Sequence, residues 1–467
     1  MRENACTTRK LTRQGELPPT APEPCHTGLD SGFPMWIAGG AVMTSTVEEA
    51  GFFILPALSF DVEEVVDDDV VVRLRELLQV ALQVEFSTIP PYLTALYSIK
   101  DKSSPAYQLV RGVVMEEMVH LNLAGNLLNA VGGTPRLVVT RGEEVVFPPR
   151  YPQHLSEKAA DGGPYLQLMP ASRELFRETF MRIEQPAQPD APAQEDEFTT
   201  IGQLYLAVEK LFRRYDEVCG EYRTEYQSDD WNFGNNGGTV IVVDSLRTAL
   251  EAINEVVEQG EGADLTNRPA DQKYEIKQPW GQYEYYGPRA DGTYGPVLGT
   301  PLEMSHYFKF KAIADGTTPL PPVYPMTPNP GRVGQYENPV AQRLSDMFDL
   351  CYSELVDQLE IALGGRRDEG SWDREAFFTR VVPLMRVALP VLATQLMQTP
   401  VVAPAYTTVD PVAGPAFRYV PAPRERLEDL RQGVVGLQGL VADDPLADGS
   451  DTLVAALRKV GAALEVG

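Results

Sequence analysis

Three predicted helices in this chain each carry a glutamate in the middle of an otherwise apolar stripe. From Asp67, leucine and alanine recur at intervals of three and four residues, and Glu85 falls on the same stripe. Glu117 falls on the stripe of a second helix and Glu209 on that of a third. Burying an unpaired carboxylate costs free energy. A fold that packs these helices together must therefore balance the negative charge of the three glutamates.

Histidines supply the second part of the pattern. Glu117 and His120 are three residues apart, so on a helix they project from nearly the same face and can bind one ion together. Glu303 and His306 repeat this Glu-x-x-His spacing on a helix predicted to begin near Thr300. The chain has only four histidines, which makes a repeated pair informative.

The chain order is one acid, a Glu-x-x-His pair, one acid, and a second Glu-x-x-His pair. This is the pattern of ferritin-like bundles that hold two iron or two manganese ions. Carboxylates bridge and charge-balance two such cations, while imidazole suits iron and manganese and leaves positions open for dioxygen. The predicted fold is therefore all-α: a ferritin-like four-helix bundle with long irregular insertions and additional C-terminal helices. The predicted metal ligands are Glu85, Glu117, His120, Glu209, Glu303 and His306.

Some of these residues also allow other roles. Glu117 and Glu303 are predicted to bridge the two ions, and so to take part in catalysis, by analogy with the bundle pattern. Glu303 also fits the N3 position of a capping box, which is a structural role. Glu116 points about 100° away from Glu117, which predicts a solvated residue or one that contacts a ligand from outside. Tyr205, one turn before Glu209, is expected to hydrogen-bond a ligand or simply to pack in the core.

Local signals divide the chain into three predicted parts. Residues 1–66 form an irregular N-terminal leader, residues 67–318 the di-metal bundle, and residues 319–467 a helical extension packed on the bundle. In the second helix Ser104 is the expected N-cap, with a proline directly after it, and Gly132 is the expected stop.

Prolines predict interruptions in two helices. Pro90 and Pro91 follow one another in the first helix. Pro383 and Pro390 fall within a C-terminal helix predicted from Glu375 to Met397. Each proline removes a helical hydrogen bond and crowds the preceding turn, so we expect a kink or a break at each site.

Composition narrows the classes of partner. The net charge of −26 argues against non-specific binding to nucleic acid or to an anionic membrane surface. No apolar run is expected to approach the roughly 20 residues that cross a bilayer. The four cysteines lack any Cys-x-x-Cys spacing, so neither a disulfide scaffold nor a thiolate zinc site is predicted. We expect a cytoplasmic protein with a small-molecule substrate, an unidentified electron donor and a possible homodimer contact.

Four segments also carry a resemblance to a known family. They are Val84–Leu93, Glu116–His120, Asn126–Pro135 and Glu258–Gly262, with a weaker likeness through residues 385–417. They resemble the ferritin-like domain of the iminophenyl-pyruvate dimer synthase family, which includes enzymes of violacein and indolocarbazole biosynthesis. The resemblance implies metal-dependent oxidative chemistry in specialised metabolism.

The predicted function joins the ligand pattern to this resemblance. We expect an oxidase or oxygenase that uses two iron ions, or two manganese ions, and dioxygen as co-substrate. Its expected substrate is a small amine or imine derived from an amino acid, on resemblance alone. Two alternatives stay open: oxidative dimerisation of an imino acid, as in larger relatives associated with haem, and a ferritin-like protein that binds metal without catalysis.

Overall fold

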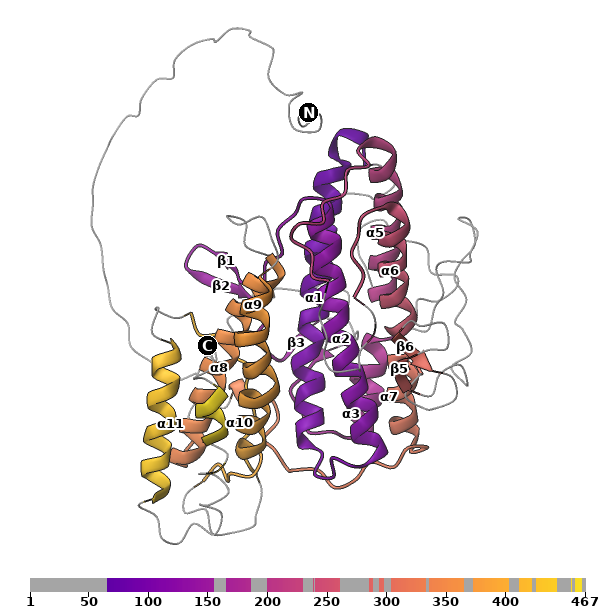
Figure 1. Cartoon of the computed structure of the whole chain (residues 1–467). Helices are drawn as coiled ribbons and strands as arrows, with labels where there is room; N and C mark the ends of the chain where they lie inside the picture. The colour runs from indigo at the N-terminus through magenta and orange to yellow at the C-terminus, as the bar shows by residue number, and fades with distance from the viewer. Residues whose placement is uncertain are drawn as a thin grey trace, which may run out of the picture. The chain divides into compact units, whose positions relative to one another are not determined.

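The computed structural model describes most of the chain from Val65 onward, and the described part is mostly helical, as predicted (Figure 1). The described residues all belong to one compact unit. The predicted leader lies almost wholly outside them. The described residues are 65–154, 165–185, 200–229, 238, 240–260, 285–288, 294–297, 304–332, 336–364, 373–402, 411–421, 426–442, 455 and 458–463.

Two long helices form the centre of the fold: α1, Val70–Ser98, and α2, Pro105–Ala130 (Figure 1). They pack against each other as a hairpin with a short connection. The Ser104 side chain accepts a hydrogen bond from the Tyr107 N–H at 3.3 Å, which confirms the predicted N-cap. Gly132 follows the end of α2 with φ +75°, a left-handed conformation that favours glycine, so the predicted stop is also confirmed.

The proline pair does not end α1. Pro90 and Pro91 have no N–H, so the carbonyls of Phe86 and Ser87 lack their usual helical hydrogen bonds. The Tyr151 hydroxyl donates to the Ser87 carbonyl at 2.8 Å instead. Because a side chain from the following segment replaces a missing donor, the helix continues through the site of the predicted interruption.

Two further helices complete a four-helix bundle with α1 and α2. They are α5, Ile201–Val218, which packs on α1, and α6, Leu246–Gly260, which packs on α5 and α2. The fourth bundle helix is therefore α6, and the prediction that the helix carrying His306 takes this place is wrong. That helix is α7, His306–Asp315, which packs on α2 and on the segment before α5.

Short elements connect α2 to α5. β1 pairs with β2 and β3 with β4, each pair antiparallel. Residues 173–183 form a helical run whose middle is π-helical, and this run packs on α7. In chain order the elements are β1 Val139–Arg141, β2 Glu144–Phe147, β3 Gln153–His154, β4 Tyr165–Leu166, α3 Arg173–Leu175, η3 Phe176–Phe180 and α4 Met181–Ile183.

The C-terminal helices pack on the bundle and on one another. α8 packs on α2, α10 on α1 and α8, and α11 on α8. The π-helical segments η6 and η7 lie on either side of Pro383. These elements are α8 Pro339–Gly364, α9 Arg374–Ala376, η6 Phe377–Val381, η7 Leu384–Ala388, α10 Leu389–Leu396 and α11 Arg426–Ala442. The remaining short elements are η1 Asp67–Asp69, β5 Tyr285–Pro288, β6 Tyr294–Val297 and η5 Pro330–Arg332.

One C-terminal stretch departs from the expectation about apolar runs. Phe377–Leu396 spans 20 residues and is long and apolar enough to cross a membrane by length and composition. Core helices also pass this test. Phe377, Val381, Leu384 and Ala388 are buried at helical spacing, and the elements that carry them pack on α8. Packing against α8 therefore accounts for part of the apolar content of this stretch.

Candidate metal centre

Five ionisable side chains meet inside the described fold and form what we call the buried cluster. Glu85 comes from α1, Glu117 and His120 from α2, Glu184 from the residue after α4, and His306 from the start of α7. Each is at most 2% exposed. Helical spacing explains why Glu117 and His120 share a face of α2, whereas the other members arrive from separate segments.

Glu117 joins two halves of the buried cluster. Nδ1 of His120 lies 4.0 Å from Glu117 Oε2 and 3.6 Å from Glu85 Oε2. Nδ1 of His306 lies 2.8 Å from the other Glu117 oxygen, Oε1, and 3.6 Å from Glu184 Oε2. The two imidazole centroids are 5.2 Å apart. Each half therefore has one histidine and one carboxylate of its own, and both halves share Glu117.

Both histidines are held from outside through Nε2. His120 Nε2 lies 2.9 Å from Oε1 of Gln259, whose amide nitrogen donates to Glu255 at 2.6 Å. That second bond orients the amide, so Nε2 of His120 is the donor to its oxygen. His306 Nε2 lies 2.9 Å from the Glu116 carboxylate and donates to it in the same way. In its neutral form each ring would then direct the Nδ1 lone pair into the buried cluster.

A buried lysine supports the outer partner of His306. Lys309 is 1% exposed, and its Nζ donates to the Glu116 carboxylate. Burial by itself raises the pKa of Glu116, but Lys309 and His306 outweigh it and hold that pKa below its usual value. Glu116 is therefore an ionised acceptor whose charge is balanced by Lys309.

Hydroxyl groups orient the carboxylates. Tyr205 donates to Glu85 Oε1 at 2.7 Å, and Tyr92 donates to Glu184 Oε1 at 2.5 Å. In each case the other oxygen, Oε2, is the one that lies 3.6 Å from a histidine Nδ1. A threonine hydroxyl from α1 donates to Glu117 Oε2 at 3.0 Å. The tyrosines thus occupy one oxygen of each outer carboxylate and leave the second directed inward.

The buried cluster crowds negative charge. Burial, and then the charge of Glu184, raises the pKa of Glu117 to about 7. Burial by itself lowers the pKa of His306, but Glu184 and its neighbours raise it well above the ordinary value. Both raised pKa values mean that these side chains bind protons more readily than usual. Added positive charge therefore stabilises the buried cluster.

Metal ions fit this need and this set of donors. His306 Nδ1 is buried and has no hydrogen-bond partner among the described residues, although two carboxylate oxygens lie within 3.6 Å. Within the described ranges, Glu117, His120 and His306 offer ligand atoms that all lie within 4.8 Å of one another. Imidazole nitrogen with carboxylate oxygen suits iron or manganese. Glu85 and Glu184 are placed to add one carboxylate to each half.

Comparison with known proteins identifies the family. A sequence profile described as Ferritin-like matches residues 78–315, slightly more than half of the chain. The chain belongs to the ferritin-like family. Among solved structures, this ferritin-like chain is similar to the crystal structure of a ferritin-like protein from Caulobacter vibrioides. The two are 21% identical, with a TM-score of 0.47, and the match covers 75% of this chain and 98% of that one. A comparison with curated proteins found no match.

The ferritin-like fold brings together four of the six predicted ligands, namely Glu85, Glu117, His120 and His306. Glu209 is buried one turn beyond Tyr205 on α5, and its Oε1 accepts hydrogen bonds from Arg213 at 3.0 and 2.9 Å. Its role as a metal ligand stays a prediction. A different acid, Glu184, lies beside His306. Glu303 lies outside the described residues.

The start of α7 differs from the prediction. The helix begins at His306, after Ser305 as N-cap, and not near Thr300. Thr300 and Glu303, the two members of the predicted capping box, lie outside the described residues, so this role of Glu303 stays a prediction. Glu303 precedes the first residue of α7, so it does not form a pair with His306 within that helix.

Sequence reasoning missed Glu184, although a signal for it exists. Phe176, Phe180 and Ile183 are fully buried, and Glu184 continues their stripe. An acid on an apolar stripe was the signal that singled out Glu209, and here it applies equally well. The stripe was harder to see because its middle turn is π-helical, which shifts the usual spacing.

Residues around the buried cluster were predicted in part. Glu116 contacts His306 from outside, which confirms one of its two expected roles, and its burial makes the solvated role wrong. The hydrogen bond from Tyr205 to Glu85 likewise confirms one of two expected roles. Gln259 fell within a segment noted only for its resemblance.

Proposed function

We propose that this ferritin-like protein is an oxidoreductase that binds two iron ions, or two manganese ions, and uses dioxygen to oxidise or oxygenate a small amine or imine. The observation that supports it most is the shared carboxylate, since each oxygen of Glu117 faces the Nδ1 atom of a different histidine. A pair of such ions, when bound, supplies dioxygen binding and the electrons for its reduction.

Each half of the buried cluster would bind one of the two ions. In this proposal Glu85 and His120 hold one ion, Glu184 and His306 hold the other, and Glu117 bridges them. Glu184 replaces Glu209 in the ligand set, and Glu303 stays a predicted further bridge. Gln259 and Glu116 fix the tautomers of the two histidines, as their hydrogen bonds suggest.

Burial gives the proposed site its second property. The five members of the buried cluster are each at most 2% exposed, so bulk water has little access to the ligand atoms. Water exclusion strengthens the interaction between the carboxylates and bound cations, and protects reactive chemistry from side reactions.

The substrate class rests on resemblance. Likeness to the iminophenyl-pyruvate dimer synthase family favours an amine or imine derived from an amino acid. Oxidative dimerisation of an imino acid and metal binding without catalysis are the two alternatives, and product analysis and dioxygen uptake distinguish them from the proposal.

Anaerobic loading with ferrous iron, metal analysis and dioxygen uptake test the proposal together. We expect two irons per chain and dioxygen consumption after air is admitted. A chain that refuses iron would overturn the proposal. Two bound irons without dioxygen consumption, in the presence of a panel of amino-acid-derived amines and imines, would support the non-catalytic alternative.

Two matched variants test the ligand assignment. Glu184→Gln should weaken binding of one iron by at least about tenfold, because it removes a ligand charge from the His306 half. Glu209→Gln, an equally conservative change on a bundle helix, should leave both irons bound. The reverse result would restore the ligand pattern predicted from sequence.

A further inference from the structure

A largely enclosed apolar cavity of about 70 Å³ lies between the α1–α2 hairpin and the C-terminal helices. Its lining includes Phe86 and Leu121 from the hairpin, Tyr352 from α8, Met385 from η7, and Phe417. The bundle and the C-terminal extension both contribute walls, so the cavity exists only because the two pack together.

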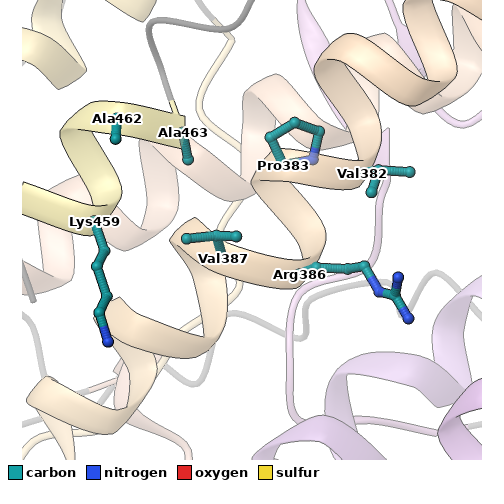
Figure 2. A pocket seen from close by; sticks show the side chains of 7 residues that line it. All are labelled: Val382, Pro383, Arg386, Val387, Lys459, Ala462 and Ala463. Carbon is teal, nitrogen blue, oxygen red and sulfur yellow. The ribbon is translucent and has the colours of Figure 1, made fainter. Parts of the chain in front are cut away.

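An open hollow nearby makes a useful contrast. It lies between the turns around Pro383 and the described helical segment 458–463 (Figure 2). Its charged lining side chains, Arg386 and Lys459, extend in different directions in Figure 2. Because these charges do not converge, the hollow offers no focused recognition and carries no proposal.

The cavity is distinct from the buried cluster, although the same helices border both. Phe86 directly follows Glu85, and Leu121 directly follows His120. Ile89 and Leu121 also line the cavity, one helical turn beyond Glu85 and Glu117 and on nearly the same faces of α1 and α2. The cavity therefore borders the buried cluster, although none of the five cluster residues lines it.

Tyr352 gives the cavity an unsatisfied polar group. The residue is 2% exposed, and its hydroxyl has no hydrogen-bond partner within the described ranges. Phe86 stacks on its ring at 6.3 Å between centroids, and Phe417 contacts it edge-on at 5.2 Å. A buried hydroxyl without a partner is unfavourable, and pairing with a ligand oxygen removes this cost.

Every side chain that lines the cavity is uncharged. An unpaired hydroxyl group within an apolar, uncharged lining favours a neutral molecule that carries one hydroxyl group of its own.

Volume and flexibility limit the size of this molecule. An apolar cavity of about 150 Å³ accommodates benzene, which has six non-hydrogen atoms, so the present space suits a molecule of about three such atoms. Met118 and Met385 both line the cavity, and methionine side chains adapt readily. Larger relatives of the same chemical class could enter if these side chains moved.

We propose that this cavity is a binding site for a small neutral alcohol, whose apolar body packs among the aromatic and aliphatic side chains and whose hydroxyl pairs with Tyr352. The proposal does not depend on the proposed function.

Methyl NMR of the full-length protein, labelled at the methionine methyl groups, tests this directly. We expect 1-propanol and xenon each to shift the signals of Met118 and Met385 saturably, while the Met304 signal stays unchanged. Acetate, which matches 1-propanol in its four non-hydrogen atoms but carries a charge, should not bind. Absence of a saturable shift with 1-propanol would overturn the proposal, whether or not xenon binds.

A single-atom change tests the role of the hydroxyl. Tyr352→Phe should weaken 1-propanol binding about twofold to tenfold and leave xenon binding unchanged, since only the alcohol uses the hydrogen bond. Tyr222→Phe, a tyrosine outside the cavity, is the control and should change neither affinity. Equal 1-propanol affinity in the Tyr352→Phe variant and the wild type would overturn the assigned contact.

Discussion

Nδ1 of His306 lies 2.8 Å from Oε1 of Glu117, yet this nitrogen has no hydrogen-bond partner among the described residues. Nearly all buried polar atoms in proteins have a partner, so an unpaired nitrogen this close to a carboxylate requires an explanation. A cation bound by both atoms would give the nitrogen its missing partner. The same relationship joins the first residue of α7 to the middle of α2.

Lys309 is expected to control iron binding without touching iron. Lys309→Met should weaken iron binding in the His306 half about tenfold, because Glu116 would lose the cation that keeps it an ionised acceptor. Anaerobic titration with ferrous iron measures this change. Lys311→Met is the control, since Lys311 is half-exposed and pairs with Asp315. Equal iron affinities for the two variants would contradict the prediction.

Gln259 is expected to support iron binding in the half of the buried cluster that contains His120. Gln259→Leu should weaken iron binding about tenfold, because Nε2 of His120 would lose its acceptor and the ring could rotate. The same titration measures the loss. Gln108→Leu, which removes an exposed bond to the Lys102 carbonyl, should have no effect. Unchanged affinity in Gln259→Leu would show that His120 does not depend on this contact.

Tyr151 should stabilise α1 through the carbonyl that Pro91 leaves unpaired. Tyr151→Phe should lower the free energy of unfolding by about 1–2 kcal/mol, because the buried Ser87 carbonyl loses its donor. Pro91→Ala restores a helical N–H for that carbonyl, so the cost of Tyr151→Phe should shrink in this background. Urea denaturation of the four variants gives the coupling. If the effects of Tyr151→Phe and Pro91→Ala on the free energy of unfolding simply add, the prediction is contradicted.

Asp349 should make stability fall as pH rises. Burial outweighs Arg418 and raises the pKa of Asp349 from 3.8 to about 6. The folded chain then holds this proton more tightly than the unfolded chain, so its contribution declines between about pH 4 and 6, by at most about 3 kcal/mol. Over this range the urea midpoint of the wild type should fall, relative to that of Asp349→Asn, as the pH rises. Parallel profiles would exclude the effect.

The parts of the fold that the sequence predicted well depend on local chemistry. Ser104 and Gly132 bound α2 because capping and left-handed backbone are properties of a few adjacent residues. The spacing of Glu117 and His120 likewise follows from one helix. Such features need no knowledge of distant segments.

The parts that were missed depend on tertiary packing. Glu184 and Glu209 both continue apolar stripes, and only the contact of the α3–α4 segment with α7 puts Glu184 beside His306. Arg213, one turn along α5, pairs with Glu209. The choice between the two acids lies in how helices meet, which periodicity along a single helix cannot specify.

The order of the cluster along the chain also governs how it can be made. During synthesis the bundle helices α1, α2, α5 and α6 leave the ribosome before α7, so the nascent bundle contains Glu85, Glu117 and Glu184 with only one of its two histidines. His306 and Lys309 arrive together in the following helix. The growing chain therefore acquires its second imidazole and its balancing ammonium group in the same step, and a complete centre can form only after residue 309 has emerged.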